Sequence, residues 1–426
     1  MEHIFFRTDS SDKIGNGHVM RCLTVAEGLK KRKIKTTFIS RPHKNNLNNF
    51  IIQKGFRVIE LPKIKKEDNK FDDWLGVDEL DDAKDTKDIV VNFSKSMIVV
   101  DHYSIGETWE KYLRPYLDKI IVIDDLANRN HDCDFLIDQN WFNDLNLRYN
   151  QLLNDNCIKL LGPSFSLLRE EFEKTKKTVK PGIKKVDTIF LFFGGTDPYN
   201  LTSKFLKILN DPIFKKIKLN IAIGENNIFK DEIKNLIKLR ENSQLYVQID
   251  NISSLIKEAD IGIGSAGINN WERMCLGLPS LVVSFADNHV EVLKDLIKED
   301  FIFFLGDIDD LNEYKVKKKL VDIINNPGQL SSQSKKIFKL VNASGSSKLI
   351  DWITGSIDNY SWSVRRACKE DAKLYFQWAN DDLVRSNAIN KSSITWEEHI
   401  DWFHRSLVNK DVFLFLIDDL IFSLKR

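Results

Sequence analysis

Apolar residues occur along the chain in short runs, and glycine turns and helical patterns separate these runs. The first such unit, residues 3–29, starts with the apolar run 4–6 and passes through the sequence Gly15-Asn16-Gly17-His18. Apolar side chains then recur at roughly helical spacing up to residue 29. The pattern predicts a strand, a glycine turn and a helix. Further strands are predicted at residues 36–40, 57–61, 96–100, 119–123, 135–137, 188–193, 218–224, 243–247 and 280–285.

The alternation of strands and helices is typical of an α/β protein with parallel sheets. It occurs twice, because a lysine-rich stretch ending at Pro181-Gly182 separates a first series from a second one that begins near residue 188. We therefore predict two Rossmann-like domains that face each other across a cleft, followed by a smaller segment. The predicted boundaries are 1–172 for the N-terminal domain, 173–186 for a linker, 187–355 for the C-terminal domain and 361–426 for the last segment.

Composition excludes several classes of function. The chain has 426 residues, of which 42% are hydrophobic, enough for two or three domains with buried cores. Lys and Arg number 63 against 62 for Asp and Glu, so no net field attracts nucleic acid or an anionic membrane. The five widely spaced cysteines fit neither a disulfide framework nor a zinc ribbon. Because the sequence shows no signal peptide or membrane span, we expect a soluble protein of the cytoplasm.

The glycine turn before residue 18 suits a phosphate group. Unpaired N–H groups and the positive end of the helix dipole meet at a helix N-terminus, so a glycine turn leading into a helix can seat a phosphate. His18 stands on this turn, and histidine is the side chain whose charge changes near neutral pH. It can therefore take a proton from water beside a phosphate ester. The alternative is a loop or capping histidine without a chemical role.

Polar residues also follow the predicted strands at 96–100 and 119–123. Because ligands of an open parallel sheet bind at the carboxyl ends of its strands, these side chains are expected at the same edge as the glycine turn. One carboxylate would orient His18 or hold a sugar hydroxyl. The alternative, carboxylates that only accept hydrogen bonds from loop N–H groups, stays open for each of them. The residues placed at this edge are Asp101, His102, Asp124 and Asp125.

A second phosphate-compatible turn lies in the second half of the chain. The predicted strand at 188–193 leads into Gly194-Gly195-Thr196, and a helical pattern follows after residue 200. This repeats the order of strand, glycine turn and helix that begins the chain. Each half therefore offers a loop whose N–H groups can hold a phosphate.

A third glycine turn matches a known pattern. Gly262, Gly264 and Gly267 satisfy GxGxxG, and Asp287 lies twenty residues beyond, as in a dinucleotide site. Three features count against that assignment: the pattern lies in the second half, the helix behind it has only about two turns, and Glu272 stands in the first turn of that helix. A carboxylate beside a glycine turn is also the acceptor that a ribose diol needs. Alternatively, it is only a partner of the helix dipole.

Six segments occur in the order RTDSSDKIGNGHVMRCLTVAEGL, VVDHY, IVIDD, LLREEF, FFGGTD and GSAGINNWERMCLGLPSLVV, the last followed by ADNH. Together they resemble the UDP-2,4-diacetamido-2,4,6-trideoxy-β-L-altropyranose hydrolases of pseudaminic acid biosynthesis, a family related to GT-B glycosyltransferases. The likeness covers roughly residues 1–351. It implies that water cleaves the glycosyl C–O bond of a nucleotide sugar, inverts the anomeric centre and releases UDP, without a metal or other cofactor.

Position by position, the resemblance assigns the catalytic base to His18, the UDP-binding loop to 264–267 and the ribose contact to Glu272. Trp271 stands where some members carry an Asn directly before the Glu. UDP is a stable leaving group, so a base for water and N–H donors at the pyrophosphate suffice. The predicted substrate-binding residues are Arg7, Asp9, Gly15, Gly17, Asp101, Tyr103, Gly194, Gly195, Thr196, Gly264, Ser265, Ala266, Gly267, Glu272 and Asn288.

From residue 361 the sequence changes character. The segments WSVRRA, LYFQWAND and WEEHIDWF resemble the first half of a GCN5-related N-acetyltransferase, of the sugar-acetylating kind used earlier in the same pathway. The resemblance implies a partial α+β segment and suggests interaction with other enzymes of that pathway. The family's pyrophosphate loop, Q/R-x-x-G-x-G/A, is not reached before residue 426, so we expect no acetyltransferase activity from this segment. His399 and His404 are expected to face solvent or the helix packing, not a metal.

The leading hypothesis is a UDP-sugar hydrolase that binds a small-molecule substrate and neither nucleic acid nor membrane. A GT-B glycosyltransferase would use the same residues, with an acceptor hydroxyl in place of water. A non-catalytic nucleotide-sugar binding protein would keep the UDP site without turnover. The GxGxxG pattern, taken by itself, would instead predict a dinucleotide-binding protein.

Overall fold

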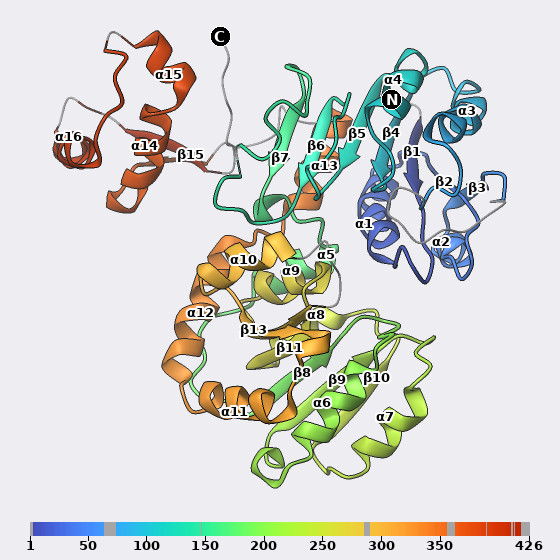
Figure 1. Ribbon diagram of the computed structural model, residues 1–426, viewed down its shortest axis with the longest axis vertical. Helices are drawn as coiled ribbons and strands as arrows, with labels where there is room; N and C mark the ends of the chain where they lie inside the picture. Colours follow the sequence, from blue (N-terminus) through green and yellow to red (C-terminus); the bar gives the residue numbers. More distant parts are fainter. Residues whose placement is uncertain are drawn as a thin grey trace. The chain divides into compact units, whose positions relative to one another are not determined.

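The computed structural model describes residues 3–63, 74–145, 147–284, 290–355, 363–388, 390–409, 412 and 414–418. The chain divides into two compact units, Met1–Gly355 and Ser356–Arg426. The first unit contains two separate parallel sheets, one drawn in blue to teal and the other in green to orange (Figure 1). Each sheet carries helices in its connections, so the unit consists of two Rossmann-like α/β domains. This confirms the predicted fold class.

The first sheet has seven strands in the order β3-β2-β1-β4-β5-β6-β7, and all neighbouring strands are parallel. Every residue of β1 is buried, as expected for a strand with helices on both faces of its sheet. β1 and β4 pair in a register that places Thr8 opposite Asp101, so their carboxyl ends meet. The strands are β1 (His3–Thr8), β2 (Thr36–Ser40), β3 (Arg57–Glu60), β4 (Ser96–Asp101), β5 (Lys119–Ile123), β6 (Phe135–Asp138) and β7 (Ile158–Leu161). The helices are α1 (Gly17–Lys31), α2 (Asn48–Gln53), α3 (Glu79–Val90), α4 (Glu107–Leu113) and α5 (Glu170–Lys176).

The second sheet has six parallel strands in the order β10-β9-β8-β11-β12-β13. β8 and β11 lie side by side at its centre, so the loops that follow these two strands share one edge. The strands are β8 (Thr188–Phe192), β9 (Lys218–Ile223), β10 (Ser243–Val247), β11 (Ile261–Ser265), β12 (Ser280–Ser284) and β13 (Phe303–Asp307). The helices are α6 (Leu201–Leu209), α7 (Lys230–Ile237), α8 (Ile252–Lys257), α9 (Ile268–Cys275), α10 (Val290–Lys298), α11 (Glu313–Ile324), α12 (Pro327–Leu340) and α13 (Gly345–Thr354).

The last helix of the first unit returns to the first sheet. Leu349 and Ile350 of α13 belong to the same buried cluster as Phe6 of β1 and Val19 of α1. Figure 1 shows this orange helix beside teal strands of the first sheet. The first sheet is therefore covered in part by residues that follow the whole second sheet in the sequence.

The apolar runs located the strands to within one or two residues. The run at 57–61 gives β3 (Arg57–Glu60), and the run at 280–285 gives β12 (Ser280–Ser284). Three strands of the two sheets, β7, β11 and β13, have no counterpart among the predicted strands. The sequence of β7, Ile-Lys-Leu-Leu, is a short run at the edge of the sheet. In the part of the chain that the structure describes, no helix is long and apolar enough to cross a lipid bilayer.

The second unit pairs β14 (Ser363–Arg366) with β15 (Phe415–Asp418) in antiparallel fashion and contains α14 (Ala372–Ala379), α15 (Asp382–Asn387) and α16 (Trp396–Val408). His399 of α16 is buried and its Nε2 lies 2.9 Å from the carbonyl oxygen of Ala372, whereas His404 is exposed. The prediction that these two histidines face helix packing or solvent is thus confirmed. The acetyltransferase likeness of this unit stays a prediction.

The approach of α13 to the first sheet depends on a glycine. A Cβ on Gly345 would lie 2.4 Å from the carbonyl oxygen of Ser166 and 2.5 Å from the carbonyl carbon of Phe165. Both are backbone atoms, which cannot swing away. Gly345→Ala should therefore lower the free energy of unfolding by about 1–3 kcal/mol through overpacking, although Ala favours helices over Gly. Urea unfolding of the full chain measures this change.

Gly328 near the start of α12 provides the matched control. A Cβ there would meet only the side-chain oxygen of Asn326, at 3.8 Å. Gly328→Ala should be neutral or stabilise the protein by up to about 1 kcal/mol. Equal effects of the two substitutions would show that the close approach of α13 does not limit stability.

Candidate active site

His18 lies in the first turn of α1, beside the carboxyl end of the first sheet. Gly15 precedes it with a φ of +78°, a left-handed conformation that glycine adopts without strain. The turn places the His18 side chain, which is 5% exposed, against the end of β4. There His18 Nδ1 lies 2.5 Å from Asp101 Oδ1. The sequence predicted that a strand-end carboxylate orients His18 without saying which one, and the contact is made by Asp101.

Arg21 fixes this carboxylate from one turn further along α1. Its Nε donates to Asp101 Oδ2 at 2.9 Å, its Nη2 donates to Asp101 Oδ1 at 2.8 Å, and its Nη1 donates to Asp125 Oδ2 at 2.9 Å. Burial alone would raise the pKa of Asp101, but the charge of Arg21 and the contact with His18 outweigh it and lower that pKa. Asp101 is therefore an ionised, doubly held acceptor at neutral pH.

The ionised carboxylate decides which nitrogen of His18 carries the proton. A carboxylate can only accept hydrogen bonds, so the close contact with Asp101 assigns the proton to His18 Nδ1. In the neutral imidazole Nε2 then keeps its lone pair. This is the tautomer that a general base needs.

Two aromatic side chains flank the imidazole. The ring of Tyr103 meets the ring of His18 edge to face with centroids 4.5 Å apart, and Trp74 lies 6.4 Å from His18 and stacks on Tyr103 at 5.7 Å. Burial, and after it the charge of Asp125, raises the pKa of the Tyr103 hydroxyl well above its usual value. Tyr103 is therefore neutral at physiological pH. Its predicted contact with the substrate stays a prediction.

Arg7 and Asp9 are fully buried next to this site. Arg7 Nη1 lies 2.7 Å from Asp9 Oδ1, and Arg7 Nη2 lies 2.7 Å from Asp82 Oδ2. Asp9 also accepts a hydrogen bond from the backbone N–H of Arg41 at 2.7 Å. These contacts join the ends of β1 and β2 to α3 and explain why a charged sequence follows an apolar strand. The contact of Arg7 and Asp9 with a ligand, which the sequence predicted, remains a prediction.

The turn Gly194-Gly195-Thr196 follows β8 as predicted, but the helix behind it is already capped. Asp197 accepts hydrogen bonds from the backbone N–H of Leu201 at 2.9 Å and of Thr202 at 2.7 Å. Its carboxylate occupies the position at the α6 N-terminus that a phosphate would take. A ligand phosphate at this turn would depend on the loop N–H groups alone.

The turn at 264–267 differs, because none of the described side chains is seen to cap the N-terminus of α9. Its N-cap is Gly267, so the first N–H groups of this helix have no partner from the N-cap side chain. Ser265 and Ala266 are buried at the end of β11. The N-terminal N–H groups of α9 are therefore suited to bind an anion, whereas those of α6 already bind Asp197.

Gly262 and Gly264 serve the packing of the strand. A Cβ on Gly264 would lie 2.3 Å from the carbonyl oxygen of Phe192 and 2.6 Å from Arg273 Nη1. A Cβ on Gly262 would lie 2.7 Å from Arg273 Cδ. These glycines make room for Arg273 beneath the strand, which accounts for the first half of the GxGxxG pattern without a dinucleotide. The predicted ligand contact of Gly264 stays a prediction.

Glu272 lies in α9, where it is 6% exposed. Its Oε1 accepts a hydrogen bond from Arg169 Nη2 at 2.9 Å, and Arg169 Nη1 lies 2.8 Å from Glu171 Oε1. This ion pair holds one oxygen of Glu272 and fixes the direction of the carboxylate. The remaining predicted substrate residue, Asn288, and Asp287 lie outside the described residues.

Sequence reasoning missed Arg21, Trp74, Arg169 and Arg273. For Arg21 a signal existed, because it stands three residues after His18 and so shares its helix face. Arg169 stands in LLREEF, which the resemblance included without giving the arginine a role. Trp74 is placed by contacts with His18 and Tyr103, which are far from it in the chain, and Arg273 is placed by the packing of α9 against the neighbouring strands, which residue spacing does not encode.

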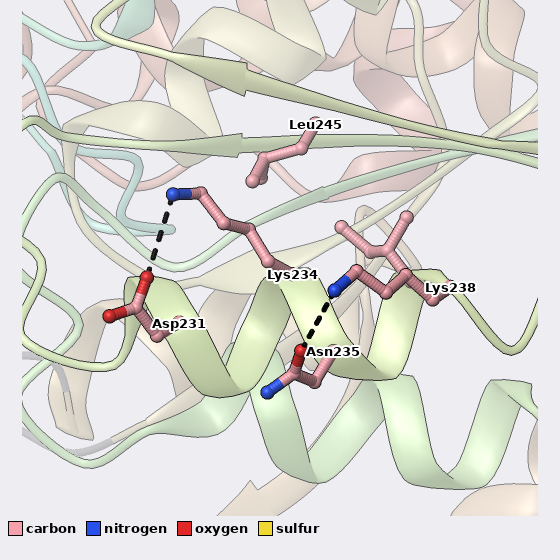
Figure 2. Close-up of a pocket in the computed structure, with 6 residues that line it drawn as sticks. Asp231, Lys234, Asn235, Lys238 and Leu245 are labelled. Carbon is pink, nitrogen blue, oxygen red and sulfur yellow. Dashed lines mark hydrogen bonds and ion pairs between the residues drawn. The ribbon is translucent and has the colours of Figure 1, made fainter.

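A surface hollow of about 420 Å³ lies elsewhere, between α7 and β10. Figure 2 shows the residues that line it. Lys234 and Lys238, two of its lining residues, face Asp231 and Asn235 of the same helix at 3.5 and 3.3 Å. None of the predicted site residues lines it. Among the described residues, no three or more His, Cys, Asp or Glu side chains are grouped so that they could hold a metal ion.

Comparison with known proteins identifies relatives of this chain. Residues 188–350 match the glycosyltransferase family 28 C-terminal domain. A UDP-2,4-diacetamido-2,4,6-trideoxy-beta-L-altropyranose hydrolase of Campylobacter jejuni is 27% identical over 70% of this chain and 97% of its own length. An uncharacterized protein of Methanocaldococcus jannaschii is 26% identical over 93% of this chain and 76% of its own length. Since Met1–Gly355 holds 355 of the 426 residues, that match extends into the second unit.

Among solved structures, the Acinetobacter baumannii protein MurG superposes on 83% of this chain and 100% of its own length. The TM-score is 0.57 and the sequence identity is 13%. A likeness at this identity shows the fold alone. The fold is that of GT-B glycosyltransferases, with two Rossmann-like domains.

Proposed function

We propose that the protein hydrolyses a UDP-linked sugar and that His18 is the general base for the attacking water. The observation that carries the proposal is the 2.5 Å contact between His18 Nδ1 and Asp101 Oδ1, with both carboxylate oxygens held by Arg21. A histidine whose Nδ1 donates to a buried carboxylate has its second nitrogen free to accept a proton. The resemblance and the relatives then indicate the substrate on which such a base acts.

In the proposed reaction, Nε2 of His18 takes a proton from water as the water oxygen forms a bond to the anomeric carbon. The bond between that carbon and the diphosphate oxygen breaks, and its electron pair leaves with UDP. The imidazolium that forms is stabilised by the negative charge of Asp101, which stays ionised because Arg21 holds it. The new charge thus develops beside a carboxylate that is already in place.

The second sheet is proposed to hold the nucleotide. The N–H groups at 264–267 and at the start of α9 would bind the diphosphate, and the oxygen of Glu272 not bound by Arg169 would accept a ribose hydroxyl. Gly194, Gly195 and Thr196 would contribute loop N–H groups. The name of the Campylobacter jejuni relative supports a diacetamido-trideoxy altrose as the sugar and pseudaminic acid biosynthesis as the pathway.

A glycosyltransferase is the second candidate, and the match of residues 188–350 to a glycosyltransferase domain favours it. In that case His18 would take the proton from an acceptor hydroxyl in place of water. The two reactions share the nucleotide site and the base. They differ only in the molecule that attacks the anomeric carbon.

His18→Asn should reduce kcat for UDP release by about 100-fold or more, since general-base catalysis typically contributes that much. Asp101→Asn should lower kcat similarly, because an amide no longer dictates the His18 tautomer. Kd for UDP, measured by calorimetry, should change little in either variant. Steady-state UDP release from UDP-2,4-diacetamido-2,4,6-trideoxy-β-L-altropyranose gives kcat.

The matched control is His404→Asn, which places the same substitution on an exposed histidine of α16. This variant should keep full activity. Retained turnover in His18→Asn would rule out the proposed base, whatever the effect at Asp101.

A panel of UDP-sugars without an acceptor separates hydrolysis from transfer. In ¹⁸O-labelled water and EDTA, the hydrolase should release UDP and place the label on the anomeric oxygen of the free sugar. Label on the phosphate would indicate P–O cleavage and contradict attack at carbon. UDP release that begins only after an acceptor sugar is added would identify a glycosyltransferase.

A further inference from the structure

Arg273 is a completely buried cation in α9. Its Nε donates to Ser280 Oγ at 3.0 Å, and its Nη2 donates to the carbonyl oxygen of Ser265 at 2.8 Å and to Asn270 Oδ1 at 3.3 Å. All three acceptors are neutral. Its Nη1 has no hydrogen-bond partner. The guanidinium therefore carries a charge that its bonded neighbours do not neutralise.

Within the described part of the chain, no carboxylate forms an ion pair with Arg273. The adjacent Glu272 is paired with Arg169. Burial lowers the pKa of Arg273 to about 10, and the charge of Glu272 opposes this shift only in part. The side chain stays protonated at neutral pH, so the protein interior contains a positive charge that has no ion-pair partner among the described residues. Proteins rarely keep such a charge without a partner.

The position of this charge coincides with the uncapped helix end. The side chain runs beneath Gly262 and Gly264 of β11, and its guanidinium reaches the carbonyl of Ser265, where the strand turns into α9. The N-cap of α9 is Gly267, which offers no side chain to the first N–H groups. Two sources of positive potential, the helix end and the buried guanidinium, therefore converge on the turn at 264–267.

We propose that Arg273 is a positioning residue for the diphosphate of a bound nucleotide, acting through the turn at 264–267 above it. The inference rests on the proposed function, because it needs a nucleotide at this turn. The diphosphate supplies the negative charge that no described residue places in contact with Arg273. In a medium of low dielectric this attraction acts across the thin layer of backbone. The contribution grows with the number of phosphate charges and vanishes for an uncharged nucleoside.

The test compares uridine, UMP and UDP by calorimetry on the full chain. Arg273→Met removes the charge and keeps a long side chain, so it should weaken UDP binding by roughly tenfold or more, weaken UMP binding less and leave uridine binding unchanged. Arg273→Lys, which keeps a charge, should retain most of the UDP affinity. Arg273→Gln keeps a donor for the Ser265 carbonyl and replaces Arg273→Met if that variant does not fold.

Lys176 gives the matched control. Its Nζ donates to the carbonyl oxygen of Cys275 at 2.8 Å, at the opposite end of α9 from the turn. Lys176→Met removes a half-buried cation of α5 that contacts the far end of α9, and it should leave the ratio of UDP to uridine affinity as in the wild type. A purely structural role of Arg273 predicts that its loss weakens all three ligands equally.

Equal weakening of uridine and UDP in both neutral variants, or no weakening of UDP, would overturn the inference while the proposed function stands. A wild-type protein that binds uridine but gains nothing from the diphosphate would also overturn it. A wild-type protein that binds neither UDP nor the UDP-sugar would overturn the proposed function and the inference with it. A loss confined to the charged nucleotides would support the inference.

Discussion

The buried contact of Asp101 with Arg21 and His18 is the interaction on which the first half of the site depends. A carboxylate without access to water is costly unless its charge is matched and its lone pairs are used, and Arg21 provides both. Because Arg21 and His18 stand one turn apart on α1, the same ion pair ties that helix to the end of β4 and turns the imidazole. The orientation of the His18 imidazole thus follows from the contacts that compensate the buried charge of Asp101. A substitution that disturbs one will disturb the other.

The second candidate part of the site, in the second sheet, also contains a buried charge, but this charge is positive. Both β8 and β11 lead through glycines into a helix, and the carboxylate of Asp197 caps the first helix, whereas no described carboxylate caps the second. Arg273 lies beneath the second turn, and no described carboxylate is in contact with it. The local sequence is similar at the two turns, so the difference between them lies in the side chains around them.

The sequence predicted those features of the fold and site that depend on local residue patterns or on the general geometry of parallel sheets. Strand positions followed from apolar runs, and the meeting of His18 with a carboxylate followed from the rule that strand ends share an edge. The contact between Gly264 and Arg273 depends on how α9 packs against β11, and which carboxylate meets His18 depends on packing between residues far apart in the chain. The same holds for Cys133 and Cys157, whose sulfur atoms lie 3.5 Å apart although 24 positions separate them. The spacing of residues along the chain does not predict such contacts.

The return of α13 to the first sheet has a consequence for how this chain is made. Leu349, Ile350 and Ile353 join a core whose other members come mostly from the first 170 residues. A ribosome releases residues in order, and N-terminal domains usually fold first. Part of the apolar core of the first sheet therefore stays uncovered until all strands of the second sheet have been translated. The two halves therefore complete their folding together, and the earlier half is the one exposed to chaperones and to misassembly in the interval.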